Sequence, residues 1–214
     1  MPRRSGDGVR HVGNGAGDLV SSLVWHITMS LDGFIAGPDD TMQWAFDAFD
    51  QDRSAEDAGQ NTGAIVAGRR WYDVATARYD GVEGIYGGAW EGPVFVLTHR
   101  PPAPSADPSV TFVSDGLDAA LEIAVRAAGD LDVEVFGADI ARQCLAAGYL
   151  DEIAVHIAPV LLGDGVRLYD VPGAAPVHLH RTEVSHTGQV VNLRFNVRNR
   201  PEVQPAAGPG PITH

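Results

Sequence analysis

The stretch DVEVFGADIARQCLAAGYLDEIAVHIAPVLL, residues 132–162, decides the fold because it holds a strand, a helix and a second strand in succession. Residues 132–137 form a short apolar run that ends at a glycine, which is typical of a buried strand. IARQCLAA then has helical spacing; we expect Asp139 to cap this helix and Gly148 to end it. A second apolar run follows at 150–162. This order favours parallel strands joined by a crossover helix.

The same alternation extends toward the N-terminus. Short apolar runs predict buried strands at 24–29, 63–68, 93–100 and 111–114. The spacing of the residues between them predicts helices over 42–60, ended by Gly59, over RRWYDVATA, and after Asp115 as the N-cap.

Toward the C-terminus the pattern changes to strands alone. Two candidate strands, near 177–186 and 189–198, meet at Thr187-Gly188 and predict a hairpin. The sequence therefore predicts an α/β fold with a mostly parallel central sheet, flanked by helices, and an antiparallel C-terminal edge. We expect a disordered leader over 1–20, a single domain over 21–199 and a flexible tail over 200–214, because both ends lack apolar periodicity.

Composition excludes several classes of function. The formal net charge of -13 argues against a nucleic-acid partner, because such proteins neutralise phosphates with basic side chains. No run approaches the roughly 18 apolar residues of a membrane span, and no signal peptide is evident. The single cysteine, Cys144, cannot form an internal disulfide, so we expect a reducing cytoplasm and a packing role for its side chain.

Basic residues follow two of the predicted strands directly. Gly68, Arg69 and Arg70 come after one strand and open a helix, so backbone N–H groups and guanidiniums are available to an anion. Thr98, His99 and Arg100 follow the next strand. In parallel sheets ligands bind beyond the carboxyl ends of the strands. The alternative, that these arginines are ordinary surface charges, remains open.

A third turn, FGADI, residues 136–140, has small residues that would let a ligand approach the backbone. Taken alone this motif is weak, since structural caps look the same. No metal-ligand spacing or nucleophile elbow occurs among the histidines, serines and the lone cysteine, so no metal site is expected.

Asp32, in MSLDGFIAGPDD, lies where the first strand ends. It is a candidate for orienting a substrate or relaying a proton, and His26 could share that task near neutral pH. The alternative is a turn cap that acts only on the backbone before Gly33. Asp47 and Asp50 are further acidic candidates, with surface positions equally open to them.

SLDGFIAG, GAIVAGRRWYDV, PVFVLTHRP and VFGADIARQCLAAGYLDEIAVHIAPVLLGDG together resemble the dihydrofolate reductase-like superfamily, in the branch similar to the C-terminal reductase domain of the riboflavin-biosynthesis deaminase-reductase. The resemblance covers roughly residues 22–198. It implies an NADPH-dependent reductase, and family members commonly pair into homodimers, here through the strand-rich C-terminal segment.

The resemblance also implies roles for particular residues. The turns holding Arg69, Arg70 and Arg100 would embrace the adenosine 2′-phosphate and the pyrophosphate of NADPH. The cofactor-binding residues so implied are Ile35, Ala36, Gly68, Arg69, Arg70, Thr98, His99, Arg100, Phe136, Gly137, Ala138, Asp139 and Ile140. Dihydrofolate reductases place a carboxylate on their first helix, and Asp47 falls near that place.

Two departures concern the substrate side. Riboflavin-pathway reductases usually carry a lysine in KxxxSLDG and a glutamate in VEGG, where this sequence has His26 and Phe136. We therefore expect hydride transfer to a C=N or C=O of a small, possibly pterin-like cyclic substrate other than the riboflavin-pathway intermediate, with Asp32, His26 and Asp47 as catalytic candidates. A catalytically silent NADPH-binding or regulatory protein is the alternative.

Overall fold

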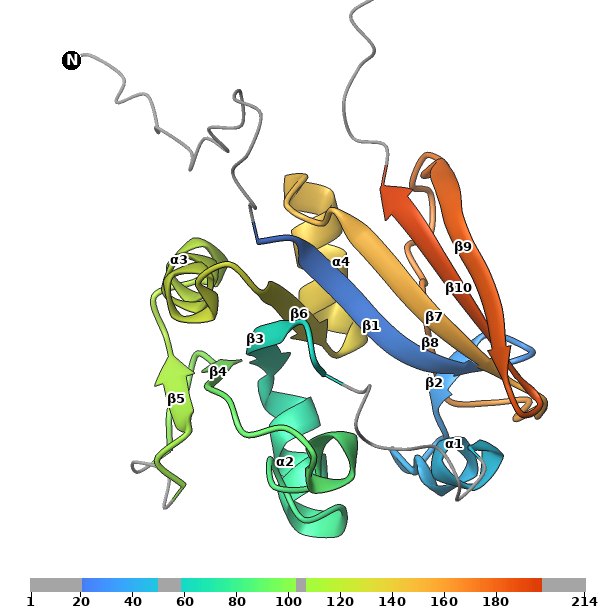
Figure 1. Cartoon of the computed structure of the whole chain (residues 1–214), viewed down its shortest axis with the longest axis horizontal. Coiled ribbons are helices and arrows are strands. Elements are labelled where there is room, and N and C mark those ends of the chain that lie inside the picture. Colours follow the sequence, from blue (N-terminus) through green and yellow to red (C-terminus); the bar gives the residue numbers. More distant parts are fainter. Residues whose placement is uncertain (1–20, 50–58, 103–106, 198–214) are drawn as a thin grey trace, which may run out of the picture.

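The computed structural model describes residues 21–49, 59–102 and 107–197. Eight strands form one sheet in the order β5-β4-β3-β6-β1-β7-β10-β9 (Figure 1). Their bounds are β1 Leu23–Ser30, β3 Thr62–Gly68, β4 Val94–Leu97, β5 Val110–Val113, β6 Asp132–Phe136, β7 Glu152–Ala158, β9 Leu179–Thr187 and β10 Val190–Val197. The strands from β5 to β7 pair in parallel, and β10 pairs antiparallel with both β7 and β9.

The first strand of the chain lies in the middle of this sheet. β1 pairs with β6 through Val24 and Glu134, and with β7 through Val24 and Glu152. Side chains alternate between the two faces of a strand, so Trp25 points to one face of the sheet and His26 to the other. The central position of β1 brings residues from both ends of the chain onto a common surface.

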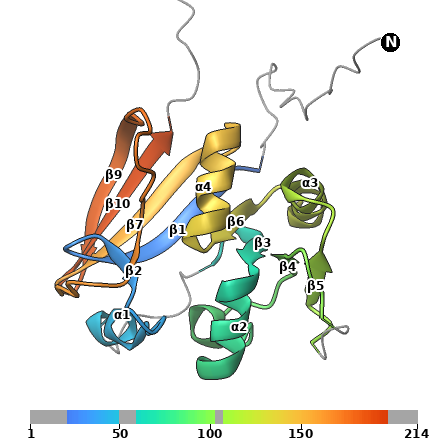
Figure 2. The same ribbon diagram turned by 180° about the vertical axis from the view of Figure 1, so that it is seen from behind.

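Helices α3 (Leu117–Ala128) and α4 (Ala138–Ala147) cover one face of the sheet, and α4 crosses in front of β1 and β7 in Figure 2. Their buried alanines and leucines pack with Trp25, Val66 and Val135 in the larger core cluster. Cys144 is fully buried in this cluster, as its expected packing role requires. Burial of this apolar face is the main stabilising contribution of the two helices.

The opposite face has a smaller apolar cluster and an uncovered part. Helix α2 (Arg69–Arg78) and the 3-10 turn η2 (Ile85–Gly88) pack against Ile65, Ala67 and Val96. The short helix α1 (Gln43–Ala48) lies below β1, and the two-stranded sheet of β2 (Phe34–Ala36) and β8 (Val166–Arg167) lies behind it. Among the described elements, no helix lies over the face of β1, β7, β10 and β9 that is turned away from α4 (Figure 1).

The predicted order of strands and helices is confirmed, including the hairpin at Thr187-Gly188 and the left-handed Gly148 that ends α4. Two capping predictions are wrong. The N-caps of α3 and α4 are Gly116 and Gly137, without a side-chain hydrogen bond, because the chain enters each helix through a positive-φ glycine rather than at Asp115 or Asp139.

Some expectations fall outside the described residues. The leader over 1–20 and the tail over 200–214 belong to segments of which no structure is described, as does Asp50. The helix expected over 42–60 is present as α1, which ends at Ala48; residues 50–58 lie outside the described ranges. Among the helices that are described, none has the length and apolar character needed to cross a membrane.

Candidate functional site

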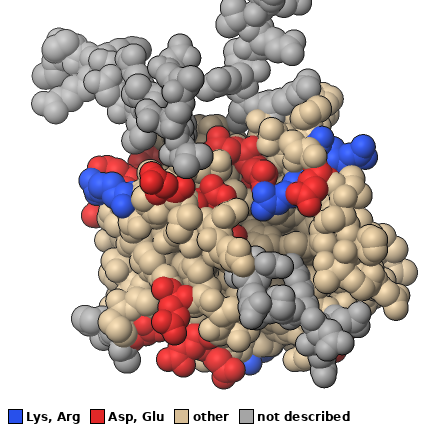
Figure 3. Space-filling view, viewed as in Figure 1, with Lys and Arg blue, Asp and Glu red and all other residues tan. Residues whose placement is uncertain are grey.

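A cavity of about 1110 Å³ opens on the face of the sheet opposite α3 and α4. It runs from the carboxyl ends of β3 and β6, across β1 and β7, to β10 and β9. In Figure 3, which looks onto this face, charged side chains gather above and below a largely uncharged middle. A cavity of this size slightly exceeds the usual range for small-molecule and cofactor sites, about 300–1000 Å³.

The strand-end turns expected to hold a cofactor line one end of this cavity. Gly68 precedes α2 and Gly137 precedes α4, so the N-termini of two helices border the same space. Gly137 has φ +96, and a Cβ at Gly68 would lie 3.2 Å from Ile140. The lining residues among those predicted to bind the cofactor are Ile35, Ala36, Gly68, Arg70, Phe136, Gly137, Ala138, Asp139 and Ile140.

The other predicted cofactor residues lie beside the cavity and do not line it. Arg69 Nη1 donates a hydrogen bond to the backbone oxygen of Arg100 at 3.1 Å, so the turns after β3 and β4 touch. Thr98 is buried, and its hydroxyl oxygen accepts from the backbone N–H of Arg100 at 3.2 Å. His99 is exposed on the same turn. The two arginine-bearing turns therefore meet at the carboxyl ends of β3 and β4.

Acidic side chains already pair with the arginines at this end. Arg70 makes an ion pair with Asp40 at 2.7 Å, and Asp139 bonds to Arg142 and to Gln143. Asp139 thus faces solvent and its neighbours within α4 rather than capping that helix. Arg142, which also lines the cavity, was not identified from the sequence.

Asp32 does not line the cavity among the described residues; it joins two loops. Ser30 Oγ donates to Asp32 Oδ1 at 2.6 Å, and the backbone N–H groups of Leu162 and Gly163 donate to the same carboxylate at 3.1 and 2.7 Å. The hydrogen bond from Ser30, with those from the two backbone amides, lowers the pKa of Asp32 to about 2. This arrangement favours the turn-cap alternative, because every oxygen of Asp32 already has a protein donor.

The acid expected on the first helix points away from the cavity. Asp47 is exposed on α1 and accepts a hydrogen bond from Gln43 Nε2 at 2.9 Å. Phe46 on the same helix and Phe49 at its C-cap line the cavity instead. The helix therefore contributes an apolar wall rather than a carboxylate.

His26 lies in the cavity and belongs to a polar cluster. Its Nδ1 atom lies 2.6 Å from the Tyr86 hydroxyl and 3.1 Å from Glu134 Oε1. Glu134 is buried, and it also accepts hydrogen bonds from Tyr86 and from Thr62 Oγ1 at 2.9 Å. Burial raises the pKa of Glu134, but the bonds from His26, Tyr86 and Thr62 outweigh it and leave that pKa below its ordinary value.

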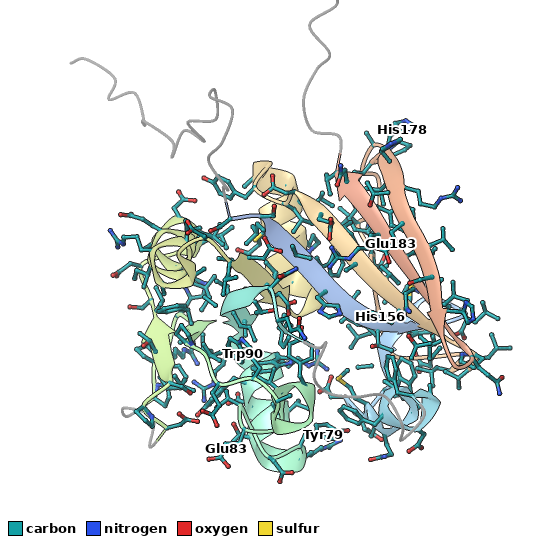
Figure 4. All side chains as sticks on the ribbon, viewed as in Figure 1. Tyr79, Glu83, Trp90, His156, His178 and Glu183 are labelled. Atoms are coloured by element: carbon teal, nitrogen blue, oxygen red, sulfur yellow. The ribbon has the colours of Figure 1, made fainter. Side chains whose placement is uncertain are left out.

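The cluster continues onto β7 and β10. His26 Nε2 lies 2.5 Å from His156 Nε2, and His156 Nδ1 lies 2.6 Å from Asn192 Oδ1. Figure 4 shows His156 near the middle of this open face, with Glu183 beyond it on β9 and Tyr79 and Trp90 below. Six segments far apart in the chain, β1, β3, η2, β6, β7 and β10, thus place polar groups on one surface.

Aromatic rings border this polar surface. Phe49 meets His156 edge-on at 5.9 Å between ring centroids, Trp71 meets Phe136 at 5.2 Å, and Tyr86 meets Phe136 at 6.5 Å. Planar apolar walls with a few convergent polar groups are typical of sites for flat heterocycles.

Glu134, Tyr86, His156 and Asn192 were missed by sequence reasoning. Two of them carry a signal: Glu134 interrupts the apolar run VEV and His156 interrupts AVHIA, each within a strand that is otherwise buried. A polar residue within such a run needs a partner, which points to a shared internal surface. Within the described ranges, no cluster of three or more histidine, cysteine or acidic residues is placed to hold a metal ion.

Comparison with known proteins gives consistent matches. The family model described as RibD C-terminal domain matches residues 21–193. The chain is 26% identical over 178 residues to the uncharacterized protein YwjB of Bacillus subtilis (strain 168), covering 80% of this chain and 95% of that protein.

Solved structures share the fold at low identity. A putative riboflavin biosynthesis protein from Shewanella sp. PV-4 superposes with a TM-score of 0.67 at 20% identity, covering 83% of this chain and 99% of the other. RibD of Acinetobacter baumannii gives 0.58 at 16% identity over 84% of this chain and 58% of its own. A pyrimidine reductase-like protein of Corynebacterium diphtheriae gives 0.54 at 13% identity over 84% and 93%.

Proposed function

We propose, from the premise that this chain belongs to the RibD C-terminal domain family, that it is an NADPH-dependent reductase of a small cyclic substrate. The family supports an oxidoreductase of the riboflavin-pathway reductase type, and the dihydrofolate reductase-like fold expected from the sequence is confirmed. The finer proposal is hydride transfer to a C=N or C=O bond. It rests on the site described above.

One observation carries this proposal: a single cavity joins the strand-end corner at Gly68 and Gly137 to the polar cluster around His26 and Glu134. A dinucleotide-dependent reductase needs a site that binds the phosphates of the cofactor and a pocket that binds the substrate. The nicotinamide ring must lie between the two. The short strand β2, with Ile35 and Ala36 in the same lining, borders the space between the two ends. The arrangement thus provides for cofactor and substrate side by side.

The residues at the corner fit a phosphate-bearing cofactor. The helix N-termini after Gly68 and Gly137 present backbone N–H groups, and Arg70 and Arg142 add guanidiniums. Arg69 and Arg100, on the two contacting turns beside the cavity, would hold the 2′-phosphate. Side chains larger than hydrogen at the two glycines would crowd Ile140 or demand a strained backbone. NADPH, when bound, would supply the hydride, and this chain would position it and exclude water.

The substrate end differs from the resembled riboflavin-pathway reductases. His26 stands in place of their lysine and Phe136 in place of their glutamate, so a phosphorylated ribityl chain would lose a cation and an acceptor. Glu134 lies two residues earlier on the same face of β6, which moves the acid deeper along the strand. We therefore place the riboflavin-pathway intermediate outside the substrates of this protein.

Cofactor titration followed by a turnover screen tests the proposal. Quenching of protein fluorescence by NADPH measures binding, and loss of the near-ultraviolet absorbance of NADPH measures reduction of dihydrofolate, dihydropterin and cyclic carbonyl compounds. We expect binding together with consumption by at least one planar heterocycle. Binding without consumption across the screen would instead identify a catalytically silent NADPH-binding protein.

We also propose that two copies associate through the C-terminal strands. β9 is exposed along nearly its whole length, and it is one of the two edge strands of the eight-stranded sheet. Val184, Leu193 and Phe195 lie on one face of the hairpin, with Val184 55% exposed. An exposed edge strand whose hairpin has apolar side chains on one face can pair with another strand, and a second copy would cover it.

A further inference from the structure

The ionisation state of Glu134 determines which atoms of the polar cluster carry hydrogens. This carboxylate is ionised, since its pKa lies below the ordinary value, and an ionised carboxylate only accepts hydrogen bonds. The contact of 3.1 Å between Glu134 Oε1 and His26 Nδ1 therefore requires a hydrogen on Nδ1. The Tyr86 hydroxyl then donates to Glu134 Oε2 and accepts from the same Nδ1–H.

The other nitrogen of His26 faces a second imidazole. His26 Nε2 and His156 Nε2 lie 2.5 Å apart. Two lone pairs at this distance repel, and two N–H groups would collide, so one proton lies between the two nitrogens. The two rings form a proton-bridged pair.

Asn192 sets the charge of this pair. Its Oδ1 atom lies 2.6 Å from His156 Nδ1, while its Nδ2 donates to Thr187 Oγ1 at 3.0 Å. With the amide in this orientation His156 Nδ1 is a donor, so both Nδ1 atoms carry a hydrogen and the bridging proton makes the pair cationic. A reversed amide would leave the pair neutral.

Charged and titratable groups face the pair from each neighbouring strand. Glu134 on β6 and Tyr86 on η2 contact His26, and Glu134 is the nearest counterion. Glu152 on β7 and Arg194 on β10 form an ion pair at 2.7 Å, and Glu183 pairs opposite Arg194 on β9. The charge of Arg194 is thus balanced by that of Glu152. The imidazole pair is therefore the group in the middle of this surface that can polarise a bound substrate.

We propose that the proton between His26 and His156 is the one the substrate receives when its C=N or C=O accepts a hydride, which rests on the proposed reductase function. Both imidazoles line the cavity, together with Ile35 and Phe136 at the cofactor side. The hydride and its electron pair form the new C–H bond, and the former π pair takes the proton from Nε2. That nitrogen keeps a lone pair, and one proton taken up from solvent restores the bridge for the next turnover.

A proton donor at this position restricts the chemical class of the substrate. An acceptor nitrogen or oxygen must approach Nε2 while the adjacent carbon faces the cofactor side of the cavity. The aromatic walls of Phe49, Tyr86 and Phe136 favour a flat ring around that bond. Planar heterocycles with a ring C=N satisfy these conditions, and saturated sugars do not.

Nitrogen NMR of the full chain labelled on histidine tests the bridge without any turnover. We expect Nδ1–H signals from both rings and one proton that couples the two Nε2 resonances, with signals assigned by His26→Gln and His156→Gln. A pair in which the two Nε2 resonances are independent overturns the inference. It would leave the reductase function standing.

Turnover with NADPH and 7,8-dihydropterin or dihydrofolate tests the donor role. His156→Gln should lower kcat by about 100-fold, the usual contribution of a general acid, and should flatten the pH profile. NADPH affinity should stay within about twofold, because the cofactor corner is untouched. His178→Gln is the matched control, since His178 is exposed and lies far from His156 in Figure 4.

The outcomes separate the two claims. Unchanged kcat and an unchanged pH profile in a folded His156→Gln protein overturn the donor role. Should His156→Gln fail to fold, the same comparison is made with His26→Gln, whose loss removes the other half of the bridge. If NADPH binds the native protein but none of the substrates causes its consumption, the reductase function is overturned, and the donor role with it. This holds whatever the NMR spectrum shows.

Discussion

Arg69 Nη1 lies 3.1 Å from the backbone oxygen of Arg100, so the turns that end β3 and β4 are in direct contact. The proposed grip on the cofactor depends on this convergence, since arginines on opposite sides of the molecule could not hold one phosphate. Arg69 is held further by Asp73 at 2.7 Å, an exposed pair that contributes little stability but fixes the direction of the guanidinium.

Arg69→Gln and Arg100→Gln should weaken NADPH binding more than NADH binding. A charge-assisted hydrogen bond to the 2′-phosphate contributes about 1.5–3 kcal/mol, so we expect about a 10- to 100-fold loss of NADPH affinity. Fluorescence titration with both cofactors measures the ratio. Arg126→Gln is the control, because Arg126 pairs with Glu122 on the solvent side of α3. Equal losses for NADPH and NADH would contradict the role of these arginines.

Asp32→Asn should destabilise the protein while leaving turnover intact. The pKa of Asp32 is lowered from 3.8 to about 2 by Ser30 and two backbone N–H groups, so its ionised form favours the folded state. This stabilisation is fully present when the pH lies above 3.8, the pKa of the aspartate in the unfolded chain. It is lost as the pH falls from 3.8 to about 2, the pKa in the folded protein. Chemical unfolding at several pH values should show a smaller acid-sensitive loss in Asp32→Asn than in the native protein. Asp164→Asn, in the same loop region, should keep the native pH dependence. Loss of turnover in a stable Asp32→Asn protein would instead support a catalytic role for Asp32.

The course of the chain was largely predictable, because local patterns determine it. Runs such as GAIVAG predicted a strand buried on both faces, and Ala64 to Ala67 are fully buried. The two capping errors arose since Asp115 and Asp139 match the preference for acids near helix N-termini, whereas positive-φ glycines make these entries. The residue preferences at helix N-termini did not show that Gly116 and Gly137, one and two residues from these acids, would be the N-caps.

The contacts within the site were much less predictable. His26 and His156 meet because β1 pairs with β7 in the register His26 to Ala154 and Thr28 to His156. That register joins segments 130 residues apart, and no local pattern encodes it. Turn motifs predicted which consecutive residues, around Gly68 and Gly137, line one end of the cavity. They left out Glu134, Tyr86 and Asn192, which join the site through contacts with His26 and His156 that are distant in the sequence.

Tyr86→Phe should lower the free energy of unfolding by about 1–3 kcal/mol, the usual effect of leaving a buried polar group without its partner. The hydroxyl serves both the carboxylate of Glu134 and Nδ1 of His26. Urea unfolding followed by fluorescence measures the change. Tyr169→Phe is the control, since Tyr169 is among the exposed large side chains. A Tyr86→Phe protein as stable as the native one would mean that the hydroxyl is not needed to satisfy Glu134.

Val184→Glu should convert the proposed dimer to a monomer. Val184 is 55% exposed on the edge strand β9, and a carboxylate there would be buried without a partner in a strand-to-strand interface. Light scattering after size-exclusion chromatography gives the mass directly. Val125→Glu is a matched control, because Val125 is 43% exposed on α3, away from β9. Should the native protein itself elute as a monomer, or Val184→Glu remain a dimer, the C-terminal strands are not the interface.

Cys144 should resist alkylation in the folded protein and react only as the core opens. Its thiol is fully buried between α4 and the sheet, and burial raises the pKa of Cys144 to about 12. At pH 8 the thiolate that reacts with iodoacetamide is therefore scarce as well as enclosed. The rate of labelling in increasing urea should follow global unfolding measured by fluorescence. Ala119→Cys, placed on the partly buried side of α3 in a Cys144→Ala background, should label by local fluctuation well below the unfolding midpoint. Rapid labelling of Cys144 in native buffer would show that α4 separates from the sheet without global unfolding, and the packing assigned to this helix would then be wrong.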